Sequence, residues 1–404
     1  MSVEPPPETV RLLNRSFMRD PYPALRELRE RCPAVPVENG GFRMWVVTRY
    51  EDARRILADP SLSRDLVAHR RAVVAQNLVD DTRRPRLPRE LRRSMLDQDG
   101  EDHLRLRRTV SRFFSPSRLD ELRPRIEERA DALLDGLPTG VPLDLVDAYA
   151  RPLPATVLAE LLGVPEEARA EFPAWENAIL TAPGTAEVED AGRRLAAFAR
   201  EVIEEKRARP ADDLFTEVVR AAADGVMDDT ELISMITLLT IAGLEPASAI
   251  GSGVLTLLDH PDELALVRAR PALMADCVEE VLRYETPFRM LTPRFLDHPL
   301  ELDGVTVPAG ELILVSTGAA NRDPGRFDSP DAFRADRCPR GHLGFSHGSH
   351  RCLGAELGRL ETTIALDRFF ARFPDTRLAA PRAEVPWRPG MFMRRLDALP
   401  VVLE

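Results

Sequence analysis

The stretch Phe345-Ser346-His347-Gly348-Ser349-His350-Arg351-Cys352-Leu353-Gly354 decides how the rest of this 404-residue sequence is interpreted. It places Cys352 between two glycines and leads into residues 355–372, where apolar side chains recur at helical spacing. Free N–H groups and the positive dipole end at a helix N-terminus favour a thiolate over a thiol. Gly348 and Gly354 would let the backbone approach a flat, bulky group. We therefore predict that this loop carries the chemistry of the protein.

Two simpler explanations of Cys352 stay open at this point. A single cysteine is most often a small, buried, apolar side chain. Cys352 could also share a zinc site with Cys338, His342, His347 and His350. Zinc motifs usually repeat closely spaced pairs such as C-x₂-C, however, and this run contains none.

Composition excludes several classes of protein. The net charge of −11 argues against nucleic acid as a partner. Four scattered cysteines without a disulfide pattern fit a reducing cytoplasm. The apolar stretch 232–258 is interrupted by Glu245 and Pro246, so we expect a buried helix and no membrane span. Residues 1–15 contain no apolar signal core. Because neither a linker nor a repeat divides the chain, we predict a single domain over 1–404.

The spacing F-x-x-G-x-H-x-C-x-G resembles the haem-binding loop of the cytochromes P-450. The resemblance implies that Cys352 is the proximal ligand of the iron of haem b. It also implies that Phe345 and Gly354 shape the cofactor-binding loop and that His350 contacts a haem propionate. Ser346 replaces a glycine usual in this motif, which we interpret as a small-for-small exchange with little effect.

Two further motifs would complete the haem site. His103 and Arg107 are four residues apart on a helix predicted over 102–114. They resemble the pair that holds the haem propionates in the family, and two cationic donors suit two carboxylates. Arg294 resembles the arginine that contacts a propionate from the β-rich region. The helix predicted over 102–114 also carries a basic stripe on the side opposite His103, formed by Arg105, Arg108 and Arg112. This stripe would be either solvated or a docking surface for an acidic electron carrier.

The longest apolar helical stretch, about 229–258, has an unusual centre. Ala242-Gly243-Leu244-Glu245-Pro246 resembles the oxygen-activation motif of the family, in which Glu245 would relay protons. A carboxylate among apolar residues is costly without a role or a partner, and Pro246 must kink the helix. The alternative is an ordinary proline kink. Pro246 also replaces the usual threonine, so its hydroxyl is missing. Ser248 is a poor substitute, because it points away from position 246.

A buried ionic cluster is expected near the loop. Glu280 and Arg283 are three residues apart on one helix, a spacing that by itself usually gives an exposed pair. Together with Arg337 they resemble the Glu–Arg–Arg network that steadies the haem-side scaffold of the family.

The remaining pattern predicts a mainly α protein with a small β region, the P-450 fold enclosing haem. A strand is predicted over 42–48, and residues 64–93 form a long arginine-rich loop. Further helices are predicted over 50–58, 119–137, 147–162, 171–182 and 188–207.

The resemblance implies a soluble, bacterial, cytoplasmic haem-thiolate monooxygenase. It would insert one oxygen atom from O₂ into a sizeable apolar molecule, in secondary-metabolite tailoring, with electrons from a ferredoxin and its NAD(P)H-dependent reductase. By family position the substrate walls would be Leu239, Ala242, Phe288, Met290, Leu291, Met391 and Phe392.

Three alternatives remain beside this function. Arg289 and the arginine-rich loop could bind an anionic group or a carrier protein that tethers the substrate. Pro246 suggests oxidative coupling or desaturation without net oxygen insertion. A non-catalytic haem-binding protein is the alternative from another class.

Overall fold

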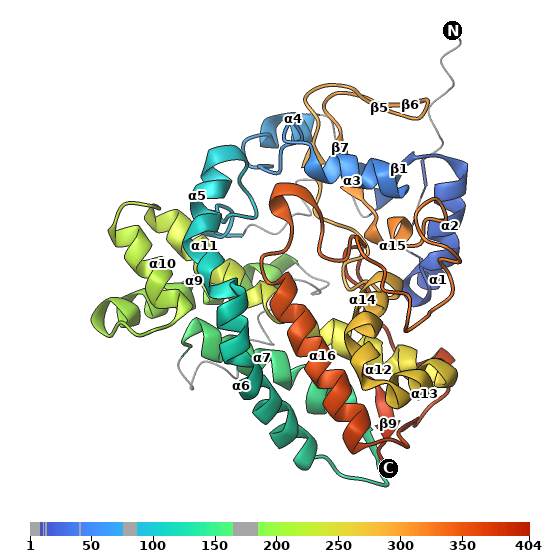
Figure 1. The fold of residues 1–404 in the computed structure, drawn as a ribbon. Helices are drawn as coiled ribbons and strands as arrows, with labels where there is room; N and C mark the ends of the chain where they lie inside the picture. Colours follow the sequence, from blue (N-terminus) through green and yellow to red (C-terminus); the bar gives the residue numbers. More distant parts are fainter. Residues whose placement is uncertain (1–8, 11, 13, 40–41, 76–86, 165–184) are drawn as a thin grey trace. The chain divides into compact units, whose positions relative to one another are not determined.

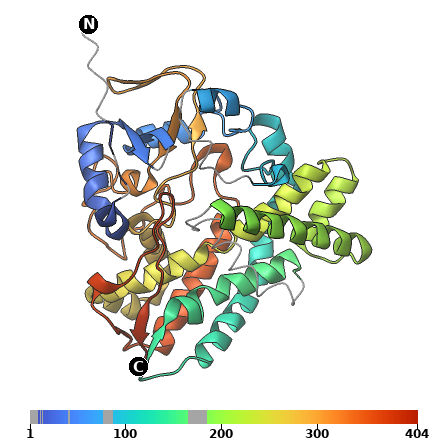
Figure 2. The same ribbon diagram turned by 180° about the vertical axis from the view of Figure 1, so that it is seen from behind.

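A computed structural model describes residues 9–10, 12, 14–39, 42–75, 87–164 and 185–404 (Figures 1 and 2). The chain forms two compact units, each assembled from separate stretches of sequence. Unit 1 comprises Met1–Arg84, Glu279–Cys352 and Trp387–Arg395, and unit 2 comprises Pro85–Val278, Leu353–Pro386 and Leu396–Glu404. The single domain over 1–404 stays a prediction.

Unit 1 is built on a four-stranded sheet of order β1-β2-β7-β4. Its strands are β1 (Ala34–Asn39), β2 (Phe42–Val47), β7 (Leu312–Val315) and β4 (Arg294–Phe295). β2 and β7 are parallel, and the other pairs are antiparallel. A separate hairpin pairs β5 (Leu300–Leu302) with β6 (Val305–Val307). The predicted strand over 42–48 is therefore confirmed, and β1 was missed.

Both faces of this sheet are buried, because alternate residues of each strand enter different hydrophobic clusters. Val35, Val46 and Leu314 share one cluster with Leu25 and other residues of helix α2 (Tyr22–Arg31). The neighbouring positions along the strands pack against α3 (Tyr50–Ala58), which presents Tyr50, Ala53, Ile56 and Leu57 to them. α3 has the bounds predicted from the sequence. Unit 1 also contains α1 (Arg15–Arg19), α4 (Arg70–Ala75) and α15 (Thr317–Ala320).

Unit 2 is helical, with a small sheet of order β3-β9-β8. The strands are β3 (Pro142–Asp144), β9 (Pro400–Val402) and β8 (Arg377–Leu378). The helices are α5 (Gly100–Ser111), α6 (Pro116–Asp135), α7 (Pro152–Leu162), α9 (Thr185–Ala208), α10 (Leu214–Ala223), α11 (Asp229–Ala242), α12 (Pro246–Asp259), α13 (Pro261–Ala269) and α16 (Ala355–Arg372). α14 (Met274–Tyr284) crosses from unit 2 into unit 1.

Helix α12 packs against α7 and α16, and α16 lies beside α6 (Figure 1). The approach of α12 to α16 depends on Gly253, where a Cβ atom would lie 2.8 Å from a methyl group of Leu366. Seen from behind, α9 and α10 lie next to each other, and both contact α11 (Figure 2). The stretch Asp229–Asp259 is long and apolar enough to cross a bilayer, but 56% of its most apolar 18-residue part is buried inside the protein. A core helix has this character.

The helix predictions for unit 2 are mostly confirmed. α16 has the predicted bounds, and α5, α6 and α9 lie within a few residues of theirs. The helix predicted over 147–162 instead begins with a π-helical turn, η4 (Val146–Ala150), followed by α7. Gly163 ends α7 in the left-handed conformation. The predicted helix over 171–182 lies outside the described residues, as does 76–86 of the arginine-rich loop.

Candidate active site

The main chain of the cysteine loop is held by its own hydrogen bonds in unit 1. The Cys352 N–H donates to the Phe345 carbonyl at 2.9 Å, and the Ser346 N–H donates to the Leu343 carbonyl at 2.9 Å. Gly348 has φ +76°, and a Cβ atom there would overlap the carbonyl oxygen of Leu57. The Cys352 side chain is nevertheless exposed, so inert burial is wrong for this cysteine. The fold fixes the loop and leaves its thiol accessible.

Serine in place of glycine at position 346 has a larger effect than expected. Its φ is +63°, in the left-handed region where a residue with a Cβ atom is strained. Glycine adopts this conformation without that penalty, which is about 1 kcal/mol for other residues. The serine therefore keeps the loop geometry at a conformational cost.

Arg294 and the turn that carries His350 meet at the C-terminal end of α3. Arg294 is buried in β4 and donates from Nη2 to the Leu57 carbonyl at 3.3 Å. The 3₁₀ turn η7 (Gly348–His350) packs against α3, with Gly348 close to the same carbonyl. Two of the proposed propionate partners thus lie in one part of unit 1.

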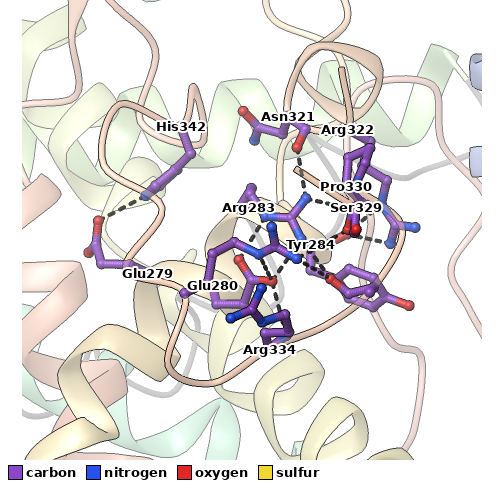
Figure 3. A network of polar contacts seen from close by, with 12 residues as sticks. Glu279, Glu280, Arg283, Tyr284, Asn321, Arg322, Ser329, Pro330, Arg334 and His342 are labelled. Carbon is purple, nitrogen blue, oxygen red and sulfur yellow. Dashed lines mark hydrogen bonds and ion pairs between the residues drawn. The ribbon is translucent and has the colours of Figure 1, made fainter. Parts of the chain in front are cut away.

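Glu280 and Arg283 are buried near the end of α14 (Figure 3), and Arg337, whose side chain is 9% exposed, joins them in one cluster. Arg283 donates to both carboxylate oxygens of Glu280 at 2.7 Å, and Arg337 Nε donates to Oε1 at 2.9 Å. The Arg334 N–H adds a fourth bond at 3.1 Å. The Glu280 and Arg283 side chains are fully buried, so hydrogen bonds to every carboxylate oxygen are needed to offset desolvation.

Helix α5 carries His103 and Arg107 in unit 2. His103 is buried, and Arg107, one turn later, is half-buried. The basic stripe on its other side is largely engaged within the unit. Arg105 contacts Glu231 Oε1 at 2.8 Å, and Arg112 pairs with Glu217. Burial raises the pKa of the Glu231 carboxyl, but the hydrogen bonds from Arg105 and from the Asp228 N–H outweigh burial and hold this pKa below its usual range. Arg112 keeps 64% of its side chain exposed in this pair, so docking of an acidic electron carrier on the stripe stays a prediction.

The central apolar helix is interrupted between α11 and α12. Gly243, Leu244 and Glu245 form a turn, and Pro246 is the first residue of α12, where a missing N–H removes no helical bond. A Cβ atom on Gly243 would overlap Leu158 of α7. Glu245 is half-buried, and the buried Ser248 hydroxyl lies 3.4 Å from its Oε2. Ser248 thus contacts the carboxylate itself, one turn along the helix.

Comparisons with known proteins bear on these motifs. The sequence model of the family described as Cytochrome P-450 matches residues 177–376. Cytochrome P-450 107B1 of Saccharopolyspora erythraea is 40% identical over 96% of both chains. The chain belongs to the cytochrome P-450 family. A second relative, the 6-deoxyerythronolide B hydroxylase of the same organism, is 39% identical over 96% of this chain and 97% of its own.

Solved structures agree with this P-450 assignment. The monooxygenase TamI with bound tirandamycin C has a TM-score of 0.92 at 35% identity, over 98% of this chain and 100% of that one. P-450 BioI, in complex with an acyl carrier protein bearing hexadec-9Z-enoic acid, has a TM-score of 0.84 at 31% identity, over 96% and 99%. The predicted mainly α fold with a small β region is therefore confirmed, and the chain is a haem-dependent monooxygenase.

The loop of this P-450 has the chemistry that haem requires. The exposed thiol on a fixed main chain would provide the ligand atom. Gly354 leaves the far end of the loop uncrowded, because a Cβ atom there would meet, among the described residues, only Phe114 at 3.7 Å. Among the residues that the structure describes, no three histidine, cysteine or acidic side chains gather as a metal site of their own.

The predicted substrate residues of unit 1 come from two segments that pair with each other. Phe288 forms a β-bridge with Met393, and the Met290 N–H donates to the Phe392 carbonyl at 3.2 Å. Phe392 is 37% exposed, but Met290 is fully buried in the hydrophobic core of the sheet. A wall role stays a prediction, and this placement favours Phe288 and Phe392 over Met290. The others divide as follows: Leu291 and Met391 are half-buried in unit 1, and in unit 2 Leu239 is buried and Ala242 exposed on α11.

Arg289 has an interior position. Its guanidinium donates to the carbonyls of Gly390 and Met391 and lies 5.0 Å from the Phe17 ring. Burial and the nearby Arg394 lower its pKa to about 10. In the described part of the chain no carboxylate pairs with it, yet its donors are directed to the main chain and only 1% of the residue is exposed. This geometry indicates a structural clamp on 390–391 and gives no support to anion binding.

Sequence reasoning missed three polar residues near the motifs. Asn321 and His342 bond to the main chain directly before the cysteine loop, and Glu361 is a fully buried carboxyl on α16. His342 was seen only as a zinc candidate. Glu361 could have been suspected, because it follows the apolar Leu360 on a face that includes Leu357 and Ile364.

Proposed function

We propose that this P-450 binds haem b through Cys352 and inserts one oxygen atom from O₂ into a sizeable apolar organic molecule. The observation that carries the proposal is the exposed Cys352 thiol on a loop whose main chain is fixed by hydrogen bonds from the N–H groups of Ser346 and Cys352. Bound haem would supply O₂ binding and oxidation, and thiolate ligation favours O–O cleavage. We place the enzyme in the cytoplasm of a bacterium, in secondary-metabolite tailoring.

The residues of the chain have separate tasks in this proposal. Arg294, His350, His103 and Arg107 would bind the propionates as cationic or hydrogen-bond donors. The Glu245 carboxyl would hold and pass protons, with the Ser248 hydroxyl 3.4 Å from it. Phe288 and Phe392 would contribute apolar wall to the substrate site. Electrons would come from a ferredoxin and an NAD(P)H-dependent ferredoxin reductase.

The test compares wild type with Cys352→Ser, both expressed with a haem precursor. We expect wild type to give a thiolate-type carbon monoxide difference spectrum that the serine variant lacks. Cys338→Ser, which removes a half-buried thiol in the same unit, should leave the spectrum unchanged. A thiolate-type spectrum that survives Cys352→Ser would refute the proposal.

Oxidative coupling or desaturation is a second candidate, favoured by Pro246 at the first position of α12. Product mass separates the reactions, since insertion adds one oxygen and coupling or desaturation removes hydrogens. Substrate-dependent NAD(P)H consumption with a ferredoxin pair would exclude a non-catalytic haem-binding protein. A substrate tethered to a carrier protein is the variant to test with acyl carrier protein conjugates, because the BioI neighbour is in such a complex.

A further inference from the structure

The two residues directly before the cysteine loop, Leu343 and Gly344, are bound by two side chains that no motif predicted. His342 lies between α14 and the loop, and Figure 3 shows its ring directed at the Glu279 carboxylate. The ring Nε2 lies 3.0 Å from Glu279 Oε2, and Nδ1 lies 3.1 Å from the N–H nitrogen of Gly344. His342 is almost fully buried, so its side chain connects α14 to the main chain of the loop.

The two contacts define which nitrogen carries the proton. The Gly344 N–H is a donor, so Nδ1 of His342 must accept. Nε2 then carries the hydrogen and donates it to Glu279, which is the neutral tautomer. A side chain at position 344 would interfere, because a Cβ atom there would lie 2.9 Å from Nδ1 and 3.0 Å from the Leu282 carbonyl oxygen. The glycine is therefore required for the contact.

A second side chain binds the adjacent residue. The Leu343 N–H donates to Asn321 Oδ1 at 2.7 Å, and the carbonyl of Asn321 accepts from Arg283 Nη1 at 2.9 Å. The buried Glu280–Arg283 cluster is thus connected to the loop through Asn321 (Figure 3). Two consecutive N–H groups, those of residues 343 and 344, are both bound by side chains.

A main-chain hydrogen bond connects the residue after Gly344 to Cys352. Residue 345 follows Gly344 directly, and its carbonyl accepts the Cys352 N–H at 2.9 Å. We propose that His342 is a positioning residue for Cys352: through Nδ1 it fixes Gly344, and thereby the carbonyl that holds the main chain of the cysteine. This inference rests on the proposed role of Cys352 as the iron ligand.

Two substitutions separate the two ring nitrogens. In His342→Asn the amide oxygen can occupy the place of Nδ1, which keeps the acceptor for Gly344 and loses the contact with Glu279. In His342→Gln the amide reaches Glu279 in the place of Nε2 and removes the acceptor. Amide hydrogen exchange of residues 343–352 is measured by mass spectrometry on the full-length, haem-loaded protein.

We expect the amides of this segment to exchange about five- to tenfold faster in the Gln variant, because one buried hydrogen bond is lost. Exchange in the Asn variant should stay within about twofold of wild type. The thiolate-type carbon monoxide difference spectrum should disappear with time faster in the His342→Gln variant than in the His342→Asn variant. His298→Gln is the matched control, since His298 is exposed and pairs with Asp297 at 2.6 Å, and exchange over 343–352 should not change.

Equal exchange in the Asn and Gln variants, or no change in either, would overturn the inference. So would an acceleration by Gln that extends equally to α6 in unit 2, because that would report a general loss of stability. The proposed function fails independently, when Cys352→Ser retains the thiolate-type spectrum, and that outcome does not depend on the exchange pattern.

Discussion

At the scale of single residues, Glu361 shows how burial alone raises the pKa of a carboxylic acid. It is 1% exposed on α16, and among the described residues its Oε2 has no hydrogen-bond partner. Desolvation raises its pKa well above 4.5, so the carboxyl is protonated over a wide range of pH. A folded pKa above the unfolded one means that its contribution to stability is present below about pH 4.5 and is lost as pH rises through the folded pKa.

Glu361→Gln should remove this pH dependence, because the amide is always neutral. Relative to wild type, the variant should gain stability with rising pH, at up to about 1.4 kcal/mol per pH unit, until the folded pKa is passed. Thermal unfolding of both proteins between pH 5 and pH 8 measures the difference. Glu356→Gln, exposed on the same helix, is the control. Parallel pH profiles of wild type and Glu361→Gln would contradict the prediction.

Pro246 and Ser248 set a second prediction at this scale. If a hydroxyl at position 246 assists proton delivery beside Glu245, Pro246→Thr should lower the peroxide released per NAD(P)H severalfold, given that positioned proton donors contribute about 10²–10⁴ in rate. Ser248→Ala should raise it, because the Ser248 hydroxyl contacts Glu245. Ala247→Thr adds the same group one residue away and serves as the control. An unaltered ratio in Pro246→Thr would show that this position has no part in proton delivery.

The limits of sequence reasoning are visible in one motif. The spacing E-x-x-R occurs at Glu280–Arg283, but also at Glu204–Arg207 and Glu356–Arg359. Only the first pair is fully buried, whereas the other two are exposed to solvent. The spacing predicts the contact, and tertiary packing decides its environment. The resemblance selected the buried pair because it also involved Arg337.

At the scale of elements, periodicity predicted the long helices and missed the exceptions. α3 and α16 have the predicted bounds because their apolar positions recur regularly. β1 was missed because Pro36 and Glu38 interrupt its pattern, yet β1 is an edge strand, where proline costs no ladder bond. The π-helical turn η4 is five residues long and has no periodicity to detect.

The end of α14 allows a comparison between two elements with the same motif. Glu280→Gln should destabilise the protein by about 3–5 kcal/mol, because Arg283 and Arg337 would lose their buried carboxylate. The matched change Glu204→Gln on α9 breaks an exposed pair and should cost less than about 1 kcal/mol. Denaturant unfolding of the two variants measures both effects. Equal losses would show that burial is not what makes the cluster important.

At the scale of the whole molecule, the units could not be derived from the sequence. The chain passes between them at 84/85, 278/279, 352/353, 386/387 and 395/396, and the last crossing returns residues 396–404 to unit 2. Composition and linkers reveal boundaries between consecutive domains, but not units made of distant segments. The cysteine loop illustrates this: Cys352 ends one segment of unit 1 and Leu353 begins one of unit 2.

The C-terminal residues should therefore be required for unit 2 to fold. Leu399, Val401 and Leu403 are fully buried, and β9 lies between β3 and β8. Each such side chain contributes about 1.5–3 kcal/mol, so deleting 399–404 removes roughly as much as the 5–15 kcal/mol that stabilises a typical protein. We expect this deletion to give insoluble or haem-free protein, measured by soluble yield and haem content. Deleting Glu404 alone removes an exposed ion pair with Arg377 and the 3.3 Å hydrogen bond from the Asp375 N–H to the Glu404 carbonyl, and it should leave both quantities near wild type. A soluble, haem-loaded protein that ends at residue 398 would show that unit 2 is held together without its central strand.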